Sequence, residues 1–208
     1  MKLKQFFKKL FKRKMTLVFL IIVVIMMIAG ILAPVIAPHD PLEQNLVMKF
    51  SMPSLEYPMG TDNLGRCIFS RILYATRTTL GFSLLCTVLA SVIGITLGVT
   101  AGYKGGVVDM LIMRLCDVLY AFPALVLVMA IVGFIGVGIF NVIIAMLILQ
   151  WLWYARVSRN LAAGESVKSY IAAARLCGAS DRKIIFRHIL PNIIPNMLAV
   201  FTVDFGHT

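Results

Sequence analysis

The chain has 208 residues, of which 60% are hydrophobic and only 14% are charged, and its mean hydropathy is +0.93. A soluble domain of this length could not bury so many apolar side chains in one core, so the composition excludes an ordinary water-soluble protein and indicates a membrane protein. The formal net charge of +11 does not indicate nucleic acid binding, because the basic residues fall in short segments between long apolar runs.

The first 15 residues contain seven lysines and arginines and precede an uncharged apolar run over 16–33. A basic segment before an apolar run is also typical of a secretory signal. This run, however, exceeds the ~7–15 residues of a signal core, and further apolar runs follow it. We therefore predict a basic N-terminus over 1–15 and an uncleaved first transmembrane helix within 16–36.

Residues 37–79 are rich in proline and too polar to span a bilayer, so they predict a folded external loop. Near its end, apolar residues recur at helical spacing, at Ile68, Phe69, Ile72 and Leu73. This spacing fits a short amphipathic helix at the membrane surface, and it fits equally well an ordinary helical lead into the next span.

A hydrocarbon core of ~30 Å requires about 20 apolar helical residues. By this rule further spans are predicted over 80–101, 115–136 and 139–155, and another begins near Ile193. The last run is still apolar at Thr208, with no charged flank after it, so we expect a missing C-terminal part.

The chain is therefore predicted to be an all-α polytopic membrane protein with five spans, in which residues 80–208 form the core transmembrane domain. The distribution of lysine and arginine predicts its orientation. If the N-terminus is cytoplasmic, the inner segments 1–15, 102–114 and 156–192 hold 16 basic residues and the outer segments hold four. This asymmetry obeys the positive-inside rule, so we predict a cytoplasmic N-terminus.

Three glycines, Gly94, Gly98 and Gly102, recur at every fourth residue along the second predicted span. One face of that helix therefore lacks side chains, which allows another backbone to approach closely. The spacing predicts packing within a helical bundle and says little about cargo.

The sequence contains no motif that indicates catalysis. It lacks a G-x-x-x-x-G-K-[ST] phosphate loop, so the chain cannot hold ATP in the P-loop manner, and it lacks H-E-x-x-H and G-x-S-x-G. The three histidines fall in separate regions and the four cysteines show no C-x-x-C spacing. We therefore predict no catalytic residue, no metal site and no disulfide framework.

Residues 156–191 are charged but carry apolar residues at regular spacing, which predicts a cytoplasmic loop with two short helices. The first helix begins near Ser166, and Gly178 supplies its stop. One side of this helix is predicted to consist of Tyr170, Ala173, Ala174 and Cys177. The second helix is predicted to begin at Ser180 or the residue after it and to end before Pro191.

Ordered blocks of residues along the chain resemble a known transporter family. Residues 172–178, Ala-Ala-Ala-Arg-Leu-Cys-Gly, are followed twelve positions later by Leu190 and Pro191, and together they resemble the E-A-A-x-x-x-G loop of bacterial ABC importer permeases. Narrower similarity to the C-type subunit of the dipeptide, oligopeptide and nickel permease family occurs at 59–66, 70–74, 101–106, 153–156 and 187–192.

The resemblance implies a type I ABC importer permease with six spans, five of them present here. It implies a bacterial inner membrane subunit that forms, with a second permease in a heterodimer, the translocation path for peptides or for nickel and other metal-chelate complexes. The expected partners are two ATPase subunits, which bind ATP and Mg, an external or periplasmic substrate-binding protein, and lipid. No nucleic acid partner is expected, and no cofactor in this chain.

The resemblance also implies that the helix over 166–177 is a coupling helix that docks in a groove of an ATPase subunit. Its apolar side would bury in that groove, with Lys168, Arg175 and Arg182 at the rim. The residues assigned to this coupling loop are Tyr170, Ala172, Ala173, Ala174, Arg175, Gly178, Leu190 and Pro191.

Two positions depart from the family pattern. Ala172 stands where the loop motif has a glutamate, so an essential carboxylate is not expected in this loop. Cys67 stands where the family has an acidic residue, which argues against a local ion pair in the external loop.

Asp204 lies in the middle of the last apolar run, where an ionisable group is costly unless it faces protein or a wet cavity. It is therefore a candidate residue of the substrate path. Two roles fit it: binding a cationic part of the cargo, or pairing with a basic or backbone group of the bundle.

The alternative function is a secondary transporter or channel that works alone. That class predicts inverted repeats, and no convincing internal repeat occurs in the sequence. A membrane enzyme would require clustered reactive groups, which the sequence also lacks.

Overall fold

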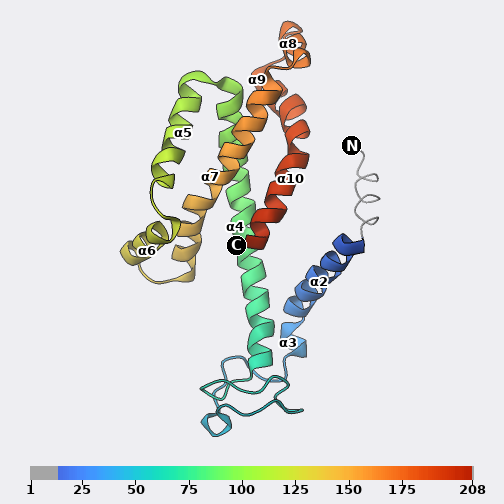
Figure 1. The fold of residues 1–208 in the computed structure, drawn as a ribbon, viewed down its shortest axis with the longest axis vertical. Coiled ribbons are helices and arrows are strands. Elements are labelled where there is room, and N and C mark those ends of the chain that lie inside the picture. The colour runs from blue at the N-terminus through green and yellow to red at the C-terminus, as the bar shows by residue number, and fades with distance from the viewer. Residues whose placement is uncertain (1–13, 208) are drawn as a thin grey trace. The chain divides into compact units, whose positions relative to one another are not determined.

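The computed structural model describes residues 14–207, and residues 1–13 of the predicted basic N-terminus lie outside this range. The described residues are almost all helical, with no strand and only an isolated β-bridge between Thr61 and Cys67 (Figure 1). The predicted all-α class is therefore confirmed. The chain divides into two units, Met1–Phe82 and Ser83–Thr208, which we describe separately.

Within the described range, three helical segments are long and apolar enough to cross a membrane: Ile68–Lys104, Ile139–Ser166 and Asp181–Gly206. A pair of helices, α5 (Gly106–Tyr120) and α6 (Ala124–Ile135), would make a fourth span if its bend is disregarded. The first predicted span falls on α2 (Lys14–Ile31), a largely apolar helix of 18 residues.

The first unit contains α2, α3 (Ala33–Ile36), the 3₁₀ turn η1 (Leu46–Met48) and the beginning of α4 (Ile68–Lys104). Gly30 of α2 lies against the backbone of α4, since a Cβ at this position would be 3.2 Å from the amide nitrogen of Arg77. The absence of a side chain at Gly30 therefore allows α2 and α4 to approach closely within this unit.

The loop between α3 and α4 folds around Asp62. The Oδ1 atom of Asp62 accepts the backbone N–H groups of Leu64 at 2.8 Å and Arg66 at 3.0 Å. Its Oδ2 atom accepts from Nε of Arg66 at 2.8 Å and from the guanidinium of Arg71. The expectation from Cys67 that no ion pair forms in this loop is therefore wrong, because Asp62 pairs with Arg66 and Arg71. Cys67 itself is buried.

The start of α4 decides between the two interpretations of the segment that begins at Ile68. The helix runs unbroken from Ile68 to Lys104, with no separate helix before the span. The segment is thus a helical lead into the span. Of the four apolar residues of this lead, Leu73 is buried, Ile68 and Phe69 are half-buried and Ile72 is exposed.

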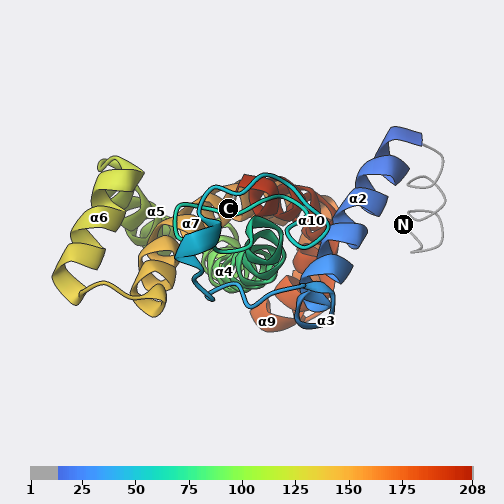
Figure 2. The same ribbon diagram turned by 90° about the horizontal axis from the view of Figure 1, so that it is seen from below.

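The second unit contains the remainder of α4, followed by seven further elements. These are α5, α6, α7 (Ile139–Ser166), α8 (Ser169–Leu176), α9 (Asp181–Ile184), the π-helical turn η2 (Ile185–Ile189) and α10 (Leu190–His207). Viewed along the helices, α4, α7 and α10 group together, and α5 and α6 lie on one side of α7 (Figure 2). Helix α7 contacts α5, α6 and α10, so it occupies the centre of this unit.

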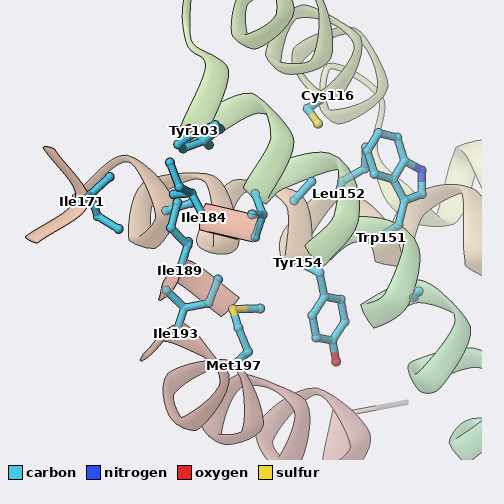
Figure 3. Packing of buried hydrophobic residues seen from close by; sticks show 14 residues of the cluster. Tyr103, Cys116, Trp151, Leu152, Tyr154, Ile171, Ile184, Ile189, Ile193 and Met197 are labelled. Atoms are coloured by element: carbon cyan, nitrogen blue, oxygen red, sulfur yellow. The ribbon is translucent and has the colours of Figure 1, made fainter. Parts of the chain in front are cut away.

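The core of the second unit draws on α4, α5, α7 and α10 and on the short helices α8 and α9 (Figure 3). Tyr103 at the end of α4, Cys116 of α5 and Tyr154 of α7 are buried in it. Ile171 of α8 and Ile184 of α9 are fully buried in the same cluster. The core therefore extends from the long helices to the base of α8.

The glycine face of α4 packs directly on α7. A Cβ at Gly94 would overlap atoms of Trp151 and Tyr154, and one at Gly98 would overlap atoms of Ala155 and Ser158. The hydroxyl of Ser158 also donates to the carbonyl of Gly94 at 3.3 Å. At the end of this face, a Cβ at Gly102 would overlap the backbone carbonyl of Arg159.

The predicted span 115–136 is not one straight helix. Helix α5 ends at Tyr120, α6 begins at Ala124, and the two helices meet at 87°. Pro123 is the N-cap of α6, with an extended ψ of 128°. It ends the preceding helix because proline disfavours helical geometry in the residue before it and cannot donate a hydrogen bond to the preceding turn. The apolar composition predicted a span, but the proline breaks it into two helices.

The predicted helix end before Pro191 is wrong. Helix α9, η2 and α10 follow one another without a break. In the π-helical turn η2 the N–H of Leu190 bonds to the carbonyl of Ile185, so the hydrogen-bond register has already changed when Pro191 is reached. Pro191 then falls in the first turn of α10, where a missing N–H is tolerated. Likewise, α7 continues to Ser166, so the first part of the predicted loop 156–191 is helical.

The contact between α4 and α7 predicts that Gly98→Ala destabilises the protein, since the new methyl overlaps the backbone of α7. We expect the free energy of unfolding to fall by about 1–3 kcal/mol, as for other overpacked sites. The control is Gly81→Ala on the same helix, because a Cβ built at Gly81 meets no neighbouring atom within 4 Å. This change should leave the free energy of unfolding unchanged or raise it. Unfolding of the detergent-solubilised protein followed by circular dichroism measures both; equal effects would contradict the packing argument.

The ring of bonds around Asp62 predicts a pH dependence of the loop. Partial burial of Asp62 would raise its pKa, but hydrogen bonds from the Leu64 and Arg66 backbone and from the Arg66 side chain outweigh burial, so the pKa is held well below its ordinary value of 3.8. The stabilisation is therefore complete above about pH 4 and is lost as the pH falls through the lowered pKa. Amide hydrogen exchange at Leu64 and Arg66 should be unchanged from pH 7 to 4 after correction for intrinsic rates, and faster below. In the Asp62→Asn variant the amides of Leu64 and Arg66 should exchange fast at every pH. Slow exchange of these amides in the variant would show that the carboxylate of Asp62 does not hold the loop.

Candidate functional site

The segment that connects α7 to α9 is the candidate site; we call residues 167–180, which include α8, the α8 loop. Helix α8 extends beyond the ends of the other helices of the second unit (Figure 1). It is shorter than the predicted helix over 166–177, because α7 itself continues to Ser166 and Val167 and Lys168 separate the two helices.

The N-terminal end of the α8 loop is bonded to both α7 and α10. The hydroxyl of Tyr170 donates to Oε2 of Glu165 on α7 at 2.6 Å and accepts from Nδ2 of Asn192 on α10 at 2.8 Å. Lys168 pairs with Oε1 of the same Glu165 at 2.6 Å, and this bond raises the pKa of Lys168. Tyr170 therefore bridges two long helices from a position on α8.

The C-terminal end of the α8 loop turns at Gly178, which has a φ of +79°. The N–H of Gly178 bonds to the carbonyl of Arg175 at 2.9 Å, and the N–H of Ala179 bonds to that of Ala174 at 3.0 Å. No atom lies within 4 Å of a Cβ built at Gly178, so the left-handed backbone and not a lack of space requires glycine there. The predicted stop at Gly178 is confirmed.

The end of α4 forms a second anchor for the loop. The hydroxyl of Tyr103 on α4 donates to Oδ1 of Asp181, the first residue of α9, at 2.7 Å. The guanidinium of Arg175 on α8 lies over the ring of Tyr103, 5.0 Å from its centre. Tyr103 is itself buried, so this anchor connects the α8 loop to the core through α4.

Three of the four residues on the predicted apolar side of α8 are open to a partner. Tyr170, Ala173 and Cys177 are exposed and Ala174 is half-buried. The helix packs on the core through Ile171, which is fully buried and which the prediction did not assign to either side. Leu176 is 90% exposed, so α8 carries an apolar surface that nothing in this unit covers.

The remaining predicted loop residues lie at the base of the segment. Leu190 is half-buried and Pro191 is exposed, both at the junction between η2 and α10. They stand beside Asn192, whose side chain bonds to Tyr170 and to the carbonyl of His188. The structure thus brings the two halves of the predicted motif together, through Asn192 and Tyr170.

Two ion pairs between α5 and α7 were not predicted. Arg159 bonds to both carboxylate oxygens of Asp109, and Arg156 bonds to Asp117 at 2.7 Å while lying over the ring of Tyr120. The spacing of these residues in the sequence already indicated the two ion pairs. The two arginines are three residues apart and lie on one face of α7, and the two aspartates are eight residues apart and lie on one face of α5.

Asp204, the ionisable residue in the last span, lies against the middle of α7. Its Oδ2 atom accepts hydrogen bonds from Nε2 of Gln150 at 2.7 Å and from the hydroxyl of Tyr154 at 2.8 Å. Asp204 and Gln150 also line a cavity of about 340 Å³ beside the bend between α5 and α6. Among the residues that the structure describes, no group of three histidine, cysteine or acidic side chains is placed to hold a metal ion.

Comparison with known proteins identifies the family. Residues 94–208, more than half of the chain, match the family described as "binding-protein-dependent transport system inner membrane component". The chain belongs to this family. Residues 2–53 of this inner membrane component also match the family described as "N-terminal TM domain of oligopeptide transport permease C".

Curated relatives of this chain are named as permeases. The chain is 36% identical over 170 residues to the nickel transport system permease protein NikC of Escherichia coli (strain K12), a match that covers 82% of this chain and 61% of NikC. It is 43% identical over 154 residues to the glutathione transport system permease protein GsiD of Escherichia coli O6:K15:H31 and of Shigella boydii serotype 4, covering 74% of this chain and 51% of GsiD. The chain thus spans about half to three-fifths of the length of these relatives.

The bridging hydroxyl predicts that Tyr170→Phe loosens the α8 loop of this inner membrane component. Two hydrogen bonds, one of them to a carboxylate, are lost, so we expect amide exchange in α8 to rise roughly 5- to 20-fold at unchanged global stability. Hydrogen exchange with mass spectrometry of the peptide that covers α8 measures this rise. Val167→Ala is the matched control, because Val167 is 83% exposed. A similar rise in both variants would show that the Tyr170 hydroxyl does not anchor the loop.

Proposed function

We propose that the chain is the transmembrane permease subunit of an ATP-driven ABC importer, and that the α8 loop couples it to separate ATPase subunits. In this proposal the protein lies in the bacterial inner membrane with its N-terminus and the α8 loop in the cytoplasm. A second permease completes the translocation path, two ATPases bind ATP and Mg, and an external binding protein delivers the cargo. The membership of the family of inner membrane components supports this assignment.

The observation that carries the proposal is the double anchoring of the α8 loop. Tyr170 connects α8 to α7 and α10, and Arg175 and Asp181 connect the loop to Tyr103 of α4. A displacement of α8 is therefore transmitted to three long helices at once. Alternating access requires such a transmission, because a partner can shift a two-state bundle only through contacts that differ between the two states.

The exposed surface of α8 fits a docking role. Leu176 and Val167 are 90% and 83% exposed, and the small side chains of Ala172 and Ala173 beside them are exposed as well. A small-residue surface with one large apolar anchor can enter a groove of a partner protein. Since position 172 is an alanine, we propose docking by apolar contact and backbone shape without a carboxylate at this position.

The cargo class is proposed as peptides or nickel and other metal-chelate complexes. The relatives that the chain resembles are named for nickel transport and for glutathione transport, and glutathione is a peptide, so the two names cover both proposed cargo classes. The chain has no phosphate loop, so hydrolysis of ATP in this proposal belongs to the partner subunits. The alternative, a stand-alone secondary transporter or channel, would not need an anchored and exposed α8.

The proposed docking predicts that Leu176→Asp weakens binding of the ATPase subunits. A charge in the apolar contact should lower the amount of co-purified ATPase at least about tenfold, in line with the loss of a central interface anchor. The fold should be retained, because the side chain of Leu176 is 90% exposed. Quantitative mass spectrometry of the complex isolated from membranes measures the ATPase that is retained.

The control for this experiment is Leu55→Asp, the same substitution at a fully exposed position of the loop before α4. It should leave the retained ATPase unchanged, since the proposed topology places this loop on the other side of the membrane. If no ATPase accompanies the unmodified protein, or if Leu176→Asp and Leu55→Asp behave alike, the stand-alone transporter becomes the better assignment.

A further inference from the structure

The cavity beside the bend between α5 and α6 has the composition of a small-molecule site. It measures about 340 Å³, at the lower end of the range for ligand pockets. One part of its wall is apolar and one part is polar. The apolar part comprises Leu119, Phe122, Ala124, Val128, Met146 and Leu149, and the polar part comprises Tyr120, Gln150 and Asp204.

Two groups of the polar part, Gln150 and Asp204, join α7 to α10. Gln150 and the neighbouring Tyr154 stand near the middle of the 28-residue helix α7, and both donate to Asp204 of α10. The two donors fix Oδ2 of Asp204 at 2.7 and 2.8 Å, which orients the carboxylate beside the cavity. A carboxylate within an apolar helix is typical of substrate or ion pathways.

Aromatic rings next to a carboxylate are suited to an organic cation. Tyr120 and Phe122 both line the cavity, and Tyr120 already holds a cation on its ring, because the guanidinium of Arg156 lies 4.4 Å from its centre. Ring faces attract ammonium and guanidinium groups electrostatically. Arg156 is bound to Asp117, so this cation belongs to the pair between α5 and α7.

We propose that this cavity binds the ammonium group of the cargo as it crosses the membrane, with Asp204 as its counter-ion and Phe122 and Tyr120 as its aromatic walls. The inference rests on the proposed function, of which it specifies the substrate class. A bare metal ion is a poorer fit, since the described residues contain no group of three metal-ligating side chains, whereas an ammonium group is satisfied by one carboxylate, a ring and a few oxygens.

The test uses the protein purified from membranes with its accompanying subunits and two photoreactive dipeptides. One is L-alanyl-L-photoleucine, with a free α-ammonium group, and the other is its N-acetylated form. We expect the first to label peptides covering 119–128 and 146–150, and the second to label them at least about tenfold less, because the charge-assisted contact is lost. Mass spectrometry of the irradiated protein locates and quantifies the label.

Three variants make the test specific. Asp204→Asn should reduce labelling by the ammonium probe at least about tenfold, to the level of the acetylated probe. Because Asp204 also joins α10 to α7, Ala124→Trp provides an independent variant that fills the cavity and should abolish labelling by both probes. Thr202→Val, an exposed position on α10 that does not line the cavity, should label like the unmodified protein.

Equal labelling by both probes, absence of label from 119–128 and 146–150, or unchanged labelling of Asp204→Asn would each overturn the inference. The amount of ATPase that co-purifies is measured in the same samples. If it is retained while the labelling fails, the proposed importer function stands and only the ammonium site is excluded. If no ATPase accompanies the protein, the proposed function fails independently of the label.

Discussion

The close contact between the backbones of α4 and α7 is the constraint on which the second unit depends. Inside a bilayer, apolar side chains gain little by leaving lipid, so helices associate through close packing and interhelical hydrogen bonds. The bare face at Gly94 and Gly98 supplies the close packing, and Ser158 adds a hydrogen bond to the carbonyl of Gly94. With α7 held in this way, α5, α6, α8 and α10 attach to it.

The polar contacts of α7 join it to different helices at different points along its length. Near its end, Arg159 holds α5 and Glu165 holds α8; near its middle, Gln150 and Tyr154 hold α10 through Asp204. Polar groups in a membrane bundle are costly unless they are paired, so their positions mark places where helices must meet in a defined register. The α8 loop is attached where this register is set, which suits it to convey motion into the bundle.

The sequence predicted the helical class, the bundle-forming glycine face and the turn at Gly178, because each follows from local composition or from a single backbone requirement. It did not predict the bend at Pro123 or the continuation through Pro191, since proline breaks a helix or is absorbed by it depending on the hydrogen-bond register of the preceding turn. It also made no prediction about Ile171, because its burial depends on the core that other helices supply.

Helix α10 connects the α8 loop to Asp204. Asn192, near its beginning, is bonded to Tyr170 of the α8 loop, and Asp204 lies twelve residues further along, about 18 Å away at helical rise. Pro195 stands between them and removes one hydrogen bond of the helix, which leaves a point where it can bend. In the proposed coupling, a displacement of α8 would change the angle at which α10 meets α7 and so move the carboxylate of Asp204 at the cavity wall. The α8 loop and the proposed ammonium site are joined by one helix, so under this proposal binding at either end would bias the other.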